Sequence, residues 1–247
     1  MKYKDYSSAI WNQIESTLDQ VLQHDPEPIA AFDADGTLWD IDLGETFFHH
    51  QIDKKLVKLP PNPWEFYEST KAVDPCKAYL WLAQICEGEK LERVHQWAKE
   101  ALNEASPIPV FSEQKKLIEL FRSKGVKVYV ITASVKWAVE PGAAMLGLQY
   151  EDVIGVETTV ENQLISTNQK GIITYRQGKV DALLEKSKGK RPFFASGNTM
   201  GDYQLLKSAT HLSLTVSAAS RDDKLYRTEY ELAQNAEKHG WLHHRFI

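Results

Sequence analysis

The stretch that decides the fold runs from Ala31 to Asp40 and reads AFDADGTLWD. It belongs to an apolar run that begins at Ile29, and a short apolar run followed by polar residues is typical of a buried strand. Asp33 and Asp35 stand at the expected carboxyl end of this strand. Because residues two apart on a strand share a face, both carboxylates can point into one small site.

Two carboxylates this close repel each other unless a proton or a cation lies between them. An oxygen-rich pair of this kind suits Mg²⁺. The same Asp-x-Asp-Gly sequence also occurs in ordinary turns. It overlaps the start of an EF-hand calcium loop as well, but Thr37 stands where that loop needs an acidic residue. The turn therefore remains an alternative on these residues alone.

Composition excludes several classes of function. The chain has 247 residues, of which 43% are hydrophobic and 26% charged, which allows one large domain or a core with an insert. A net charge of -5 without a basic run predicts no role in nucleic-acid binding. Neither a membrane-spanning run nor an apolar signal segment is present, so we expect a cytoplasmic protein with no membrane partner. Cys76 and Cys86 lack a metal or redox spacing and are interpreted as ordinary thiols.

Helical and β-rich segments alternate over most of the chain. We expect helices at 8–23, 112–124, from 135 to about 145 and 179–186, and strands at 29–32, 126–131, 153–156, 163–166, 192–195 and 212–216. Such alternation predicts an α/β fold with a parallel sheet covered on both faces.

The segment 42–108 interrupts this alternation directly after the first strand. Its pattern is helical and unusually aromatic, with a break at Pro60-Pro61-Asn62-Pro63. We interpret it as an inserted helical cap domain. Residues 1–41 and 109–247 then form the α/β core.

Polar residues follow three of the predicted strands. Asp33 and Asp35 follow the first, Thr132 and Ser134 the second, and Asn198 and Asp202 a later one, while Lys179 opens a helix. The carboxyl ends of parallel strands meet at one edge of the sheet, so these side chains should converge. A phosphomonoester site needs this set: one carboxylate as nucleophile, a second as acid and base, and a hydroxyl, a lysine and Mg²⁺ for the phosphoryl oxygens.

In this order the segments resemble the four motifs of the haloacid dehalogenase superfamily. FDADGTLWD is similar to the first motif, VYVITAS to the second, GKVDALLE to the third and FFASGNTMGDYQLL to the fourth. The resemblance spans residues 29–216 and implies a Rossmann-like parallel sheet with a cap inserted after the first strand.

The resemblance also implies roles for single residues. Asp33 would be the nucleophile and a Mg²⁺ ligand, and Asp35 the general acid and base, with its backbone carbonyl on the metal. Thr132 would bind phosphate, and Lys179 would bridge phosphate and nucleophile. Lys170, before Gly171, is the alternative for the third motif. An acid at Asp35 favours phosphate chemistry over dehalogenation, because a dehalogenase has no alcohol to protonate.

The fourth motif departs from the family pattern. Asn198 stands where phosphoserine phosphatase-like members carry an aspartate, and Asp202 matches the second acidic position. An amide oxygen can bind Mg²⁺ but brings no negative charge. Either Asn198 or Asp202 is therefore the third metal ligand, and Asn198→Asp is expected to strengthen Mg²⁺ binding.

The insert resembles the cap of the phosphoserine and phosphorylcholine phosphatase branch. That resemblance implies a small phosphorylated metabolite as substrate, with a cationic group such as that of phosphoserine or phosphocholine. Trp39, Asp42 and Glu45, together with Ser134, are the predicted substrate-binding residues, since carboxylates and aromatic faces hold ammonium groups. Two alternatives remain: a phosphotransferase on the same fold, and a non-catalytic binding protein on a decayed phosphatase fold, motivated by Asn198. The oligomeric state is not predicted.

Overall fold

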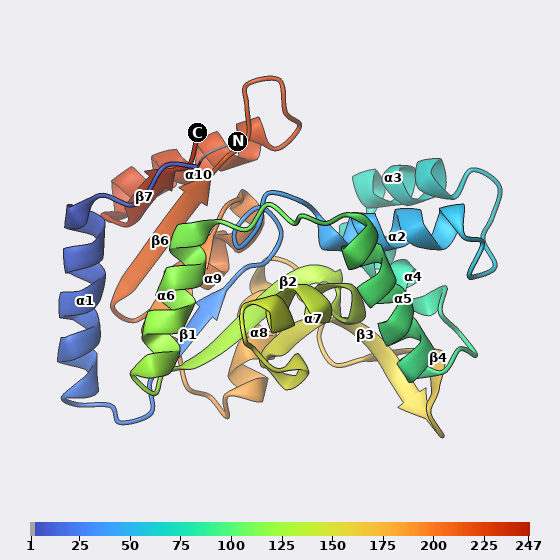
Figure 1. The fold of residues 1–247 in the computed structure, drawn as a ribbon, viewed down its shortest axis with the longest axis horizontal. Coiled ribbons are helices and arrows are strands. Elements are labelled where there is room, and N and C mark those ends of the chain that lie inside the picture. The colour runs from blue at the N-terminus through green and yellow to red at the C-terminus, as the bar shows by residue number, and fades with distance from the viewer. Residues whose placement is uncertain (1–2) are drawn as a thin grey trace.

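A mostly parallel sheet runs through the centre of the molecule (Figure 1). The computed structural model describes residues 3–247 and gives these a seven-stranded sheet in the order β4-β3-β2-β1-β5-β6-β7. Neighbouring strands are parallel except β3 and β4, which form an antiparallel hairpin. The strands are β1 (Ile29–Phe32), β2 (Lys127–Val135), β3 (Val153–Glu161), β4 (Leu164–Lys170), β5 (Phe194–Gly197), β6 (Leu212–Ser217) and β7 (Leu242–Arg245).

Helices cover both faces of the sheet, as the alternating pattern predicts. Ala30 and Phe32 of β1 pack in one apolar cluster with α1 (Ser8–Leu22), α6 (Ser112–Ser123) and part of α7 (Lys136–Met145). Ile29 and Ala31 pack on the opposite face with α8 (Gln177–Lys186), α9 (Tyr203–Ser208) and α10 (Tyr226–His239). All four residues of β1 are buried, which explains why this central strand is a continuous apolar run. The predicted α/β fold class is confirmed.

Four helices occupy the segment that was predicted to be a helical insert. They are α2 (Leu43–Asp53), α3 (Pro63–Val73), α4 (Pro75–Gln84) and α5 (Leu91–Glu104), on the right of Figure 1. Their aromatic residues, including Phe47 and Phe48, form a separate apolar cluster, which Val135, Trp137 and Val156 join from the sheet side. The insert therefore shares its core with β2, α7 and β3, and its division from the rest as a cap domain stays a prediction.

The last part of the chain contains elements that the sequence pattern did not predict. After β6 the chain forms α10 and then β7, which pairs in parallel with β6 at the edge of the sheet. Strand β7 is short and reads LHHR, so it lacks an apolar alternation. The first turn of α10 lies near the carboxyl end of β5, where Met200 donates its N–H to Thr228. Within residues 3–247 no helix has the length and apolar character needed to cross a bilayer.

Candidate active site

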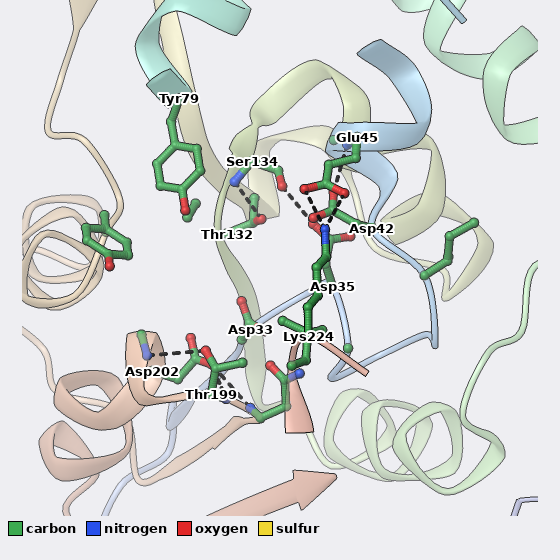
Figure 2. Close-up of a pocket in the computed structure, with 18 of the residues that line it drawn as sticks. Asp33, Asp35, Asp42, Glu45, Tyr79, Thr132, Ser134, Thr199, Asp202 and Lys224 are labelled. Carbon is green, nitrogen blue, oxygen red and sulfur yellow. Dashed lines mark hydrogen bonds and ion pairs between the residues drawn. The ribbon is translucent and has the colours of Figure 1, made fainter. Parts of the chain in front are cut away.

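A cavity of about 390 Å³ opens beyond the carboxyl ends of β1, β2 and β5 (Figure 2). Strand β1 pairs with β2 on one side and with β5 on the other, so the loops that leave these strands diverge and open a crevice. Every predicted site residue except one lines this cavity: Asp33, Asp35, Asp42, Glu45, Thr132, Ser134, Lys179, Asn198 and Asp202. The fold therefore brings together residues that the sequence singled out from four distant segments.

Lys179 lies between two buried carboxylates at the base of the cavity. Its Nζ is 2.5 Å from Oδ1 of Asp33 and 2.6 Å from Oδ1 of Asp202. Burial alone would lower the pKa of Lys179, but the carboxylates of Asp202 and Asp33 outweigh it and raise this pKa. Burial raises the pKa of Asp33 to about 7, an effect that Asp202 adds to and Lys179 opposes. Thr37 also donates to Asp33, to Oδ2 at 2.8 Å.

Asp35 is held by three hydrogen-bond donors on the insert side of the cavity. Oδ1 accepts from Nε1 of Trp39 at 2.8 Å and from the backbone N–H of Leu43 at 2.9 Å, and Oδ2 accepts from Ser134 Oγ at 2.7 Å. Burial raises the pKa of Asp35, although these hydrogen bonds and the charge of Lys179 counteract it. A fixed carboxyl group of raised pKa can retain a proton and deliver it to a neighbouring oxygen.

Trp39 is the exception among the predicted substrate-binding residues. Its side chain is fully buried in the core cluster around β1 and does not line the cavity. The indole reaches the site through its N–H, which donates to Asp35. Nearness in sequence to the first motif was therefore a poor guide, because the direction of the side chain decides which residues meet a substrate.

The end of β2 supplies hydroxyl groups to the cavity. Thr132 is almost fully buried, and its Oγ1 accepts from the backbone N–H of Ser134 at 3.1 Å. Ser134 is committed through its own Oγ–H to Asp35. Thr132 thus lies where the second motif was expected to bring a hydroxyl, and Ser134 acts on Asp35.

Asn198 and Asp202 differ in how free their oxygens are. Asp202 gives Oδ1 to Lys179, and its Oδ2 accepts from the backbone N–H groups of Asn198 at 3.2 Å and Thr199 at 3.0 Å. Within residues 3–247 the Oδ1 of Asn198 has one hydrogen-bond partner, Thr37 Oγ1 at 3.4 Å, and this hydroxyl also donates to Asp33. Of the two candidates for the third metal ligand, Asn198 therefore has the oxygen with fewer hydrogen bonds, and the choice between them stays a prediction.

The site offers hard oxygen donors of mixed type. No group of three His, Cys, Asp or Glu side chains suited to a metal ion occurs within residues 3–247. The carboxylate of Asp33 and the amide oxygen of Asn198 nevertheless share Thr37 as a hydrogen-bond partner, in a cavity that Asp35 also lines. Carboxylate, amide and backbone oxygens suit Mg²⁺, which usually binds one or two carboxylates and keeps several waters. The residues fit this ion.

Residues 30–207 match the family of haloacid dehalogenase-like hydrolases. The chain belongs to this family. Over 195 residues it is 26% identical to a phosphorylcholine phosphatase from Pseudomonas aeruginosa, and the aligned part covers 62% of this chain and 55% of that protein. The chain thus spans about half the length of the curated relative that it matches.

Two solved structures are similar in fold to this haloacid dehalogenase-like chain. A conserved protein of unknown function from Anaerococcus prevotii superposes with a TM-score of 0.74 at 14% identity, covering 98% of this chain and 95% of its own. A phosphoserine phosphatase in its apo form gives a TM-score of 0.51 at 15% identity, covering 82% and 90%. At these identities the likeness concerns the fold, and it confirms the predicted Rossmann-like core.

The geometry separates the two candidate lysines of the third motif. Lys170 lies on the exposed hairpin strand β4 and pairs with Glu157 at 3.2 Å. Lys179, at the start of α8, reaches Asp33 directly. Of the two, Lys179 is therefore the lysine that belongs to the cavity of this haloacid dehalogenase-like chain.

The upper wall of the cavity contains two lysines that sequence reasoning missed. Glu45 pairs with Lys71 at 2.9 Å and with Lys224 at 3.2 Å, and these lysines lower its pKa against the opposing effect of burial. Asp42 caps α2 by accepting the N–H of Glu45 at 2.7 Å, and burial together with Asp35 and Glu45 raises its pKa well above the usual range. Glu45 is therefore not a free carboxylate that awaits a substrate cation.

Other lining residues also lay outside the sequence prediction. Tyr67, Tyr79 and Tyr175 face the cavity from α3, α4 and the loop before α8, and Figure 2 shows Tyr79 pointing into it. Glu229 borders it from α10. Only the high aromatic content of the insert signalled the first two, and nothing in the sequence pattern signalled Glu229, because the segment after residue 216 had no predicted elements.

Proposed function

We propose that this chain is a Mg²⁺-dependent phosphatase that hydrolyses a small phosphomonoester through an aspartyl-phosphate on Asp33. The observation that carries the proposal is the position of Lys179, buried between Asp33 and Asp202 at the end of β1. A carboxylate that is to attack an anionic phosphate must have its charge balanced, and Lys179 balances it.

Each step has a residue in this chain. An Asp33 oxygen attacks phosphorus, and the bond from phosphorus to the alcohol oxygen breaks as Asp35 donates its proton to that oxygen. Asp35 then takes a proton from water, which attacks the phosphoryl group on Asp33 and releases phosphate. Lys179 and Thr132 hold the phosphoryl oxygens. The raised pKa of Asp35 supports the first half of this cycle, since the group must begin protonated.

Asp33, the backbone carbonyl of Asp35 and the amide oxygen of Asn198 would hold the Mg²⁺. When bound, the ion supplies positive charge that neutralises the phosphoryl oxygens. Asp202 orients Lys179 through Oδ1 and the loop of Asn198 through Oδ2. Against the non-catalytic alternative stands the pairing of Lys179 with Asp33 and Asp202, which phosphoryl transfer through Asp33 would use.

A cationic substrate such as phosphocholine or phosphoserine is the finer proposal. Its support is the phosphorylcholine phosphatase relative and three tyrosines around the cavity, which offer aromatic faces to an ammonium group. Lys71 opposes it, since its Nζ lies 5.0 Å from the centre of the Tyr67 ring and also pairs with Glu45. A substrate cation would therefore compete with Lys71 for both partners.

Hydrolysis of a generic aryl phosphate tests the catalytic proposal. We expect turnover with Mg²⁺, none in EDTA, and loss of at least about 10³-fold in kcat for Asp33→Asn, with unchanged secondary structure by circular dichroism. Exposed Asp181→Asn on α8 is the matched control and should retain full activity. Turnover by Asp33→Asn above a few per cent of wild type would exclude the covalent route.

A further inference from the structure

Asn198 is oriented by a carboxylate that approaches it from another element. Its Nδ2 lies 3.2 Å from Oε1 of Glu229, in the first turn of α10, and both side chains are almost completely buried. A carboxylate accepts hydrogen bonds and donates none, so only the NH₂ end of the amide can face Glu229. The amide oxygen must then point the other way, toward Thr37 and Asp33.

Glu229 is itself fixed firmly enough to act as an orienting group. Its Oε2 accepts the backbone N–H of Ala218 at 3.1 Å and that of Ala219 at 2.9 Å. Three uncharged N–H groups thus surround the carboxylate. A second contact between α10 and the Asn198 loop, in which the N–H of Met200 donates to Thr228, holds the two segments in register.

Gly36 packs closely against the Asn198 amide. A Cβ at this position would lie 2.1 Å from Nδ2 of Asn198, and the backbone of Gly36 has a φ of +75°, where glycine is favoured. The NH₂ end of the Asn198 amide is therefore closely packed against Gly36 as well as bonded to Glu229.

We propose that Glu229 is a positioning residue for the cation site: it holds the Asn198 amide oxygen toward the metal and supplies, through that amide, the negative charge that an aspartate at position 198 would have brought. The proposal rests on the proposed Mg²⁺ site. Partners behind a metal ligand commonly fix its orientation and strengthen it as a donor. It explains why an amide stands at position 198, since a second carboxylate there would face Glu229 at hydrogen-bond distance and repel it.

The proposal changes what Asn198→Asp should do. From the sequence alone, a carboxylate at this position is expected to strengthen Mg²⁺ binding. Because Glu229 already supplies a negative charge, the carboxylate introduced by Asn198→Asp adds little, and it removes the hydrogen bond between residue 198 and Glu229. We therefore expect the Mg²⁺ dissociation constant to change by less than about threefold. In a Glu229→Gln background the same substitution should matter much more.

A double-mutant cycle on Mg²⁺ binding tests this inference without using turnover. Titration calorimetry with Mg²⁺ alone, and the rise of Tm with Mg²⁺, are measured for wild type, Asn198→Asp, Glu229→Gln and the double variant. Glu229→Gln should weaken binding at least about tenfold, because its single amide oxygen cannot accept from both the Asn198 NH₂ and the backbone N–H groups of Ala218 and Ala219. Asn198→Asp should restore at least about tenfold in that background, since the introduced carboxylate can accept from the introduced amide and still face the metal. Glu231→Gln, which removes an exposed charge from the same helix, should leave binding unchanged.

The outcomes separate this inference from the proposed function. If wild type and Glu229→Gln bind Mg²⁺ with equal affinity, the role of Glu229 is overturned and the proposed function stands. The same holds if the effects of the two substitutions are simply additive in the double variant. Wild type that binds no Mg²⁺ overturns both proposals. Should Glu229→Gln fail to fold in EDTA, Glu229→Asp keeps the charge and shortens its reach by one methylene. It should weaken binding at least about threefold, and wild-type affinity in that variant would overturn the inference.

Discussion

At the scale of single residues, the charges of the cavity wall are balanced in two groups, in each of which one side chain pairs with two of opposite charge. At the base of the cavity, Lys179 forms ion pairs with Asp33 and Asp202. At the top, Glu45 forms ion pairs with Lys71 and Lys224. Removing one partner from a buried ion pair costs about 3–5 kcal/mol, because the other charge is left uncompensated. The base group is fully buried and fixed, whereas Lys224 is largely exposed, so the upper group is the one that a substrate can rearrange.

Lys71→Met is expected to favour cationic substrates, because it frees the face of Tyr67 and leaves Glu45 paired with the exposed Lys224 alone. We expect kcat/KM for phosphocholine to rise by about tenfold relative to glycerol phosphate, which corresponds to one ion pair of about 1.4 kcal/mol. Steady-state rates on both substrates give the ratio. Lys77→Met, an exposed lysine on α4, is the control and should leave the ratio unchanged. Equal changes for both substrates in Lys71→Met would mean that Glu45 does not meet the substrate headgroup.

The ends of helices and strands place the site at the scale of elements, and this is where sequence reasoning succeeded and failed. The apolar run before Asp33 predicted β1 and its position at the site, because the strand is buried on both faces. The order of the four motifs predicted that Lys179 lies at the site, although 146 positions separate it from Asp33. Lys71, Lys224 and Glu229 could not be predicted, because they reach the site through packing of α3, α10 and the loop before α10. The prediction that Trp39 lines the cavity was wrong, because its side chain packs in the core although the residue stands next to the first motif in sequence.

The N-cap of α2 gives a prediction on stability. Asp42 accepts the N–H of Glu45, and its raised pKa means that it holds a proton in the folded state that the unfolded chain releases above its ordinary value of 3.8. Folded stability from this group therefore falls as pH rises above about 4. Asn caps a helix as well as Asp and carries no charge. Asp42→Asn should stabilise the fold at pH 7 by on the order of 1 kcal/mol and flatten the fall. Thermal melts between pH 4 and pH 8 measure this, and a lower Tm at pH 7 would contradict it.

At the scale of the whole molecule, residues near the beginning of the described chain contact residues near its end. The N–H of Lys4 donates to the carbonyl of Phe246 at 2.8 Å. Phe246 is fully buried and stacks on Phe111 with ring centres 4.0 Å apart. Phe111 donates its N–H to the carbonyl of Leu38, in the loop that follows Asp35. Phe246 thus stabilises the first motif indirectly, through Phe111.

Phe246→Ala should lower the free energy of unfolding by about 3–5 kcal/mol, the usual cost of removing a buried aromatic side chain. Urea denaturation monitored by circular dichroism measures the loss. Tyr230→Ala, on the exposed side of α10 with 53% of its surface accessible, should change stability by less than about 0.5 kcal/mol. A loss below about 1 kcal/mol for Phe246→Ala would show that the C-terminal residues are not part of the cooperative core.

The hydrogen bond from the N–H of Leu43 to Asp35 makes the first turn of α2 and the proton on Asp35 thermodynamically linked. This bond lowers the proton affinity of Asp35 and burial raises it, so a movement of α2 that changes both alters that affinity and moves protons to or from solution. The linkage is reciprocal: deprotonation of Asp35 tightens the first turn of α2. Any molecule that shifts α2 as it binds must therefore exchange protons with the buffer, and its heat of binding will vary with the ionisation enthalpy of the buffer chosen.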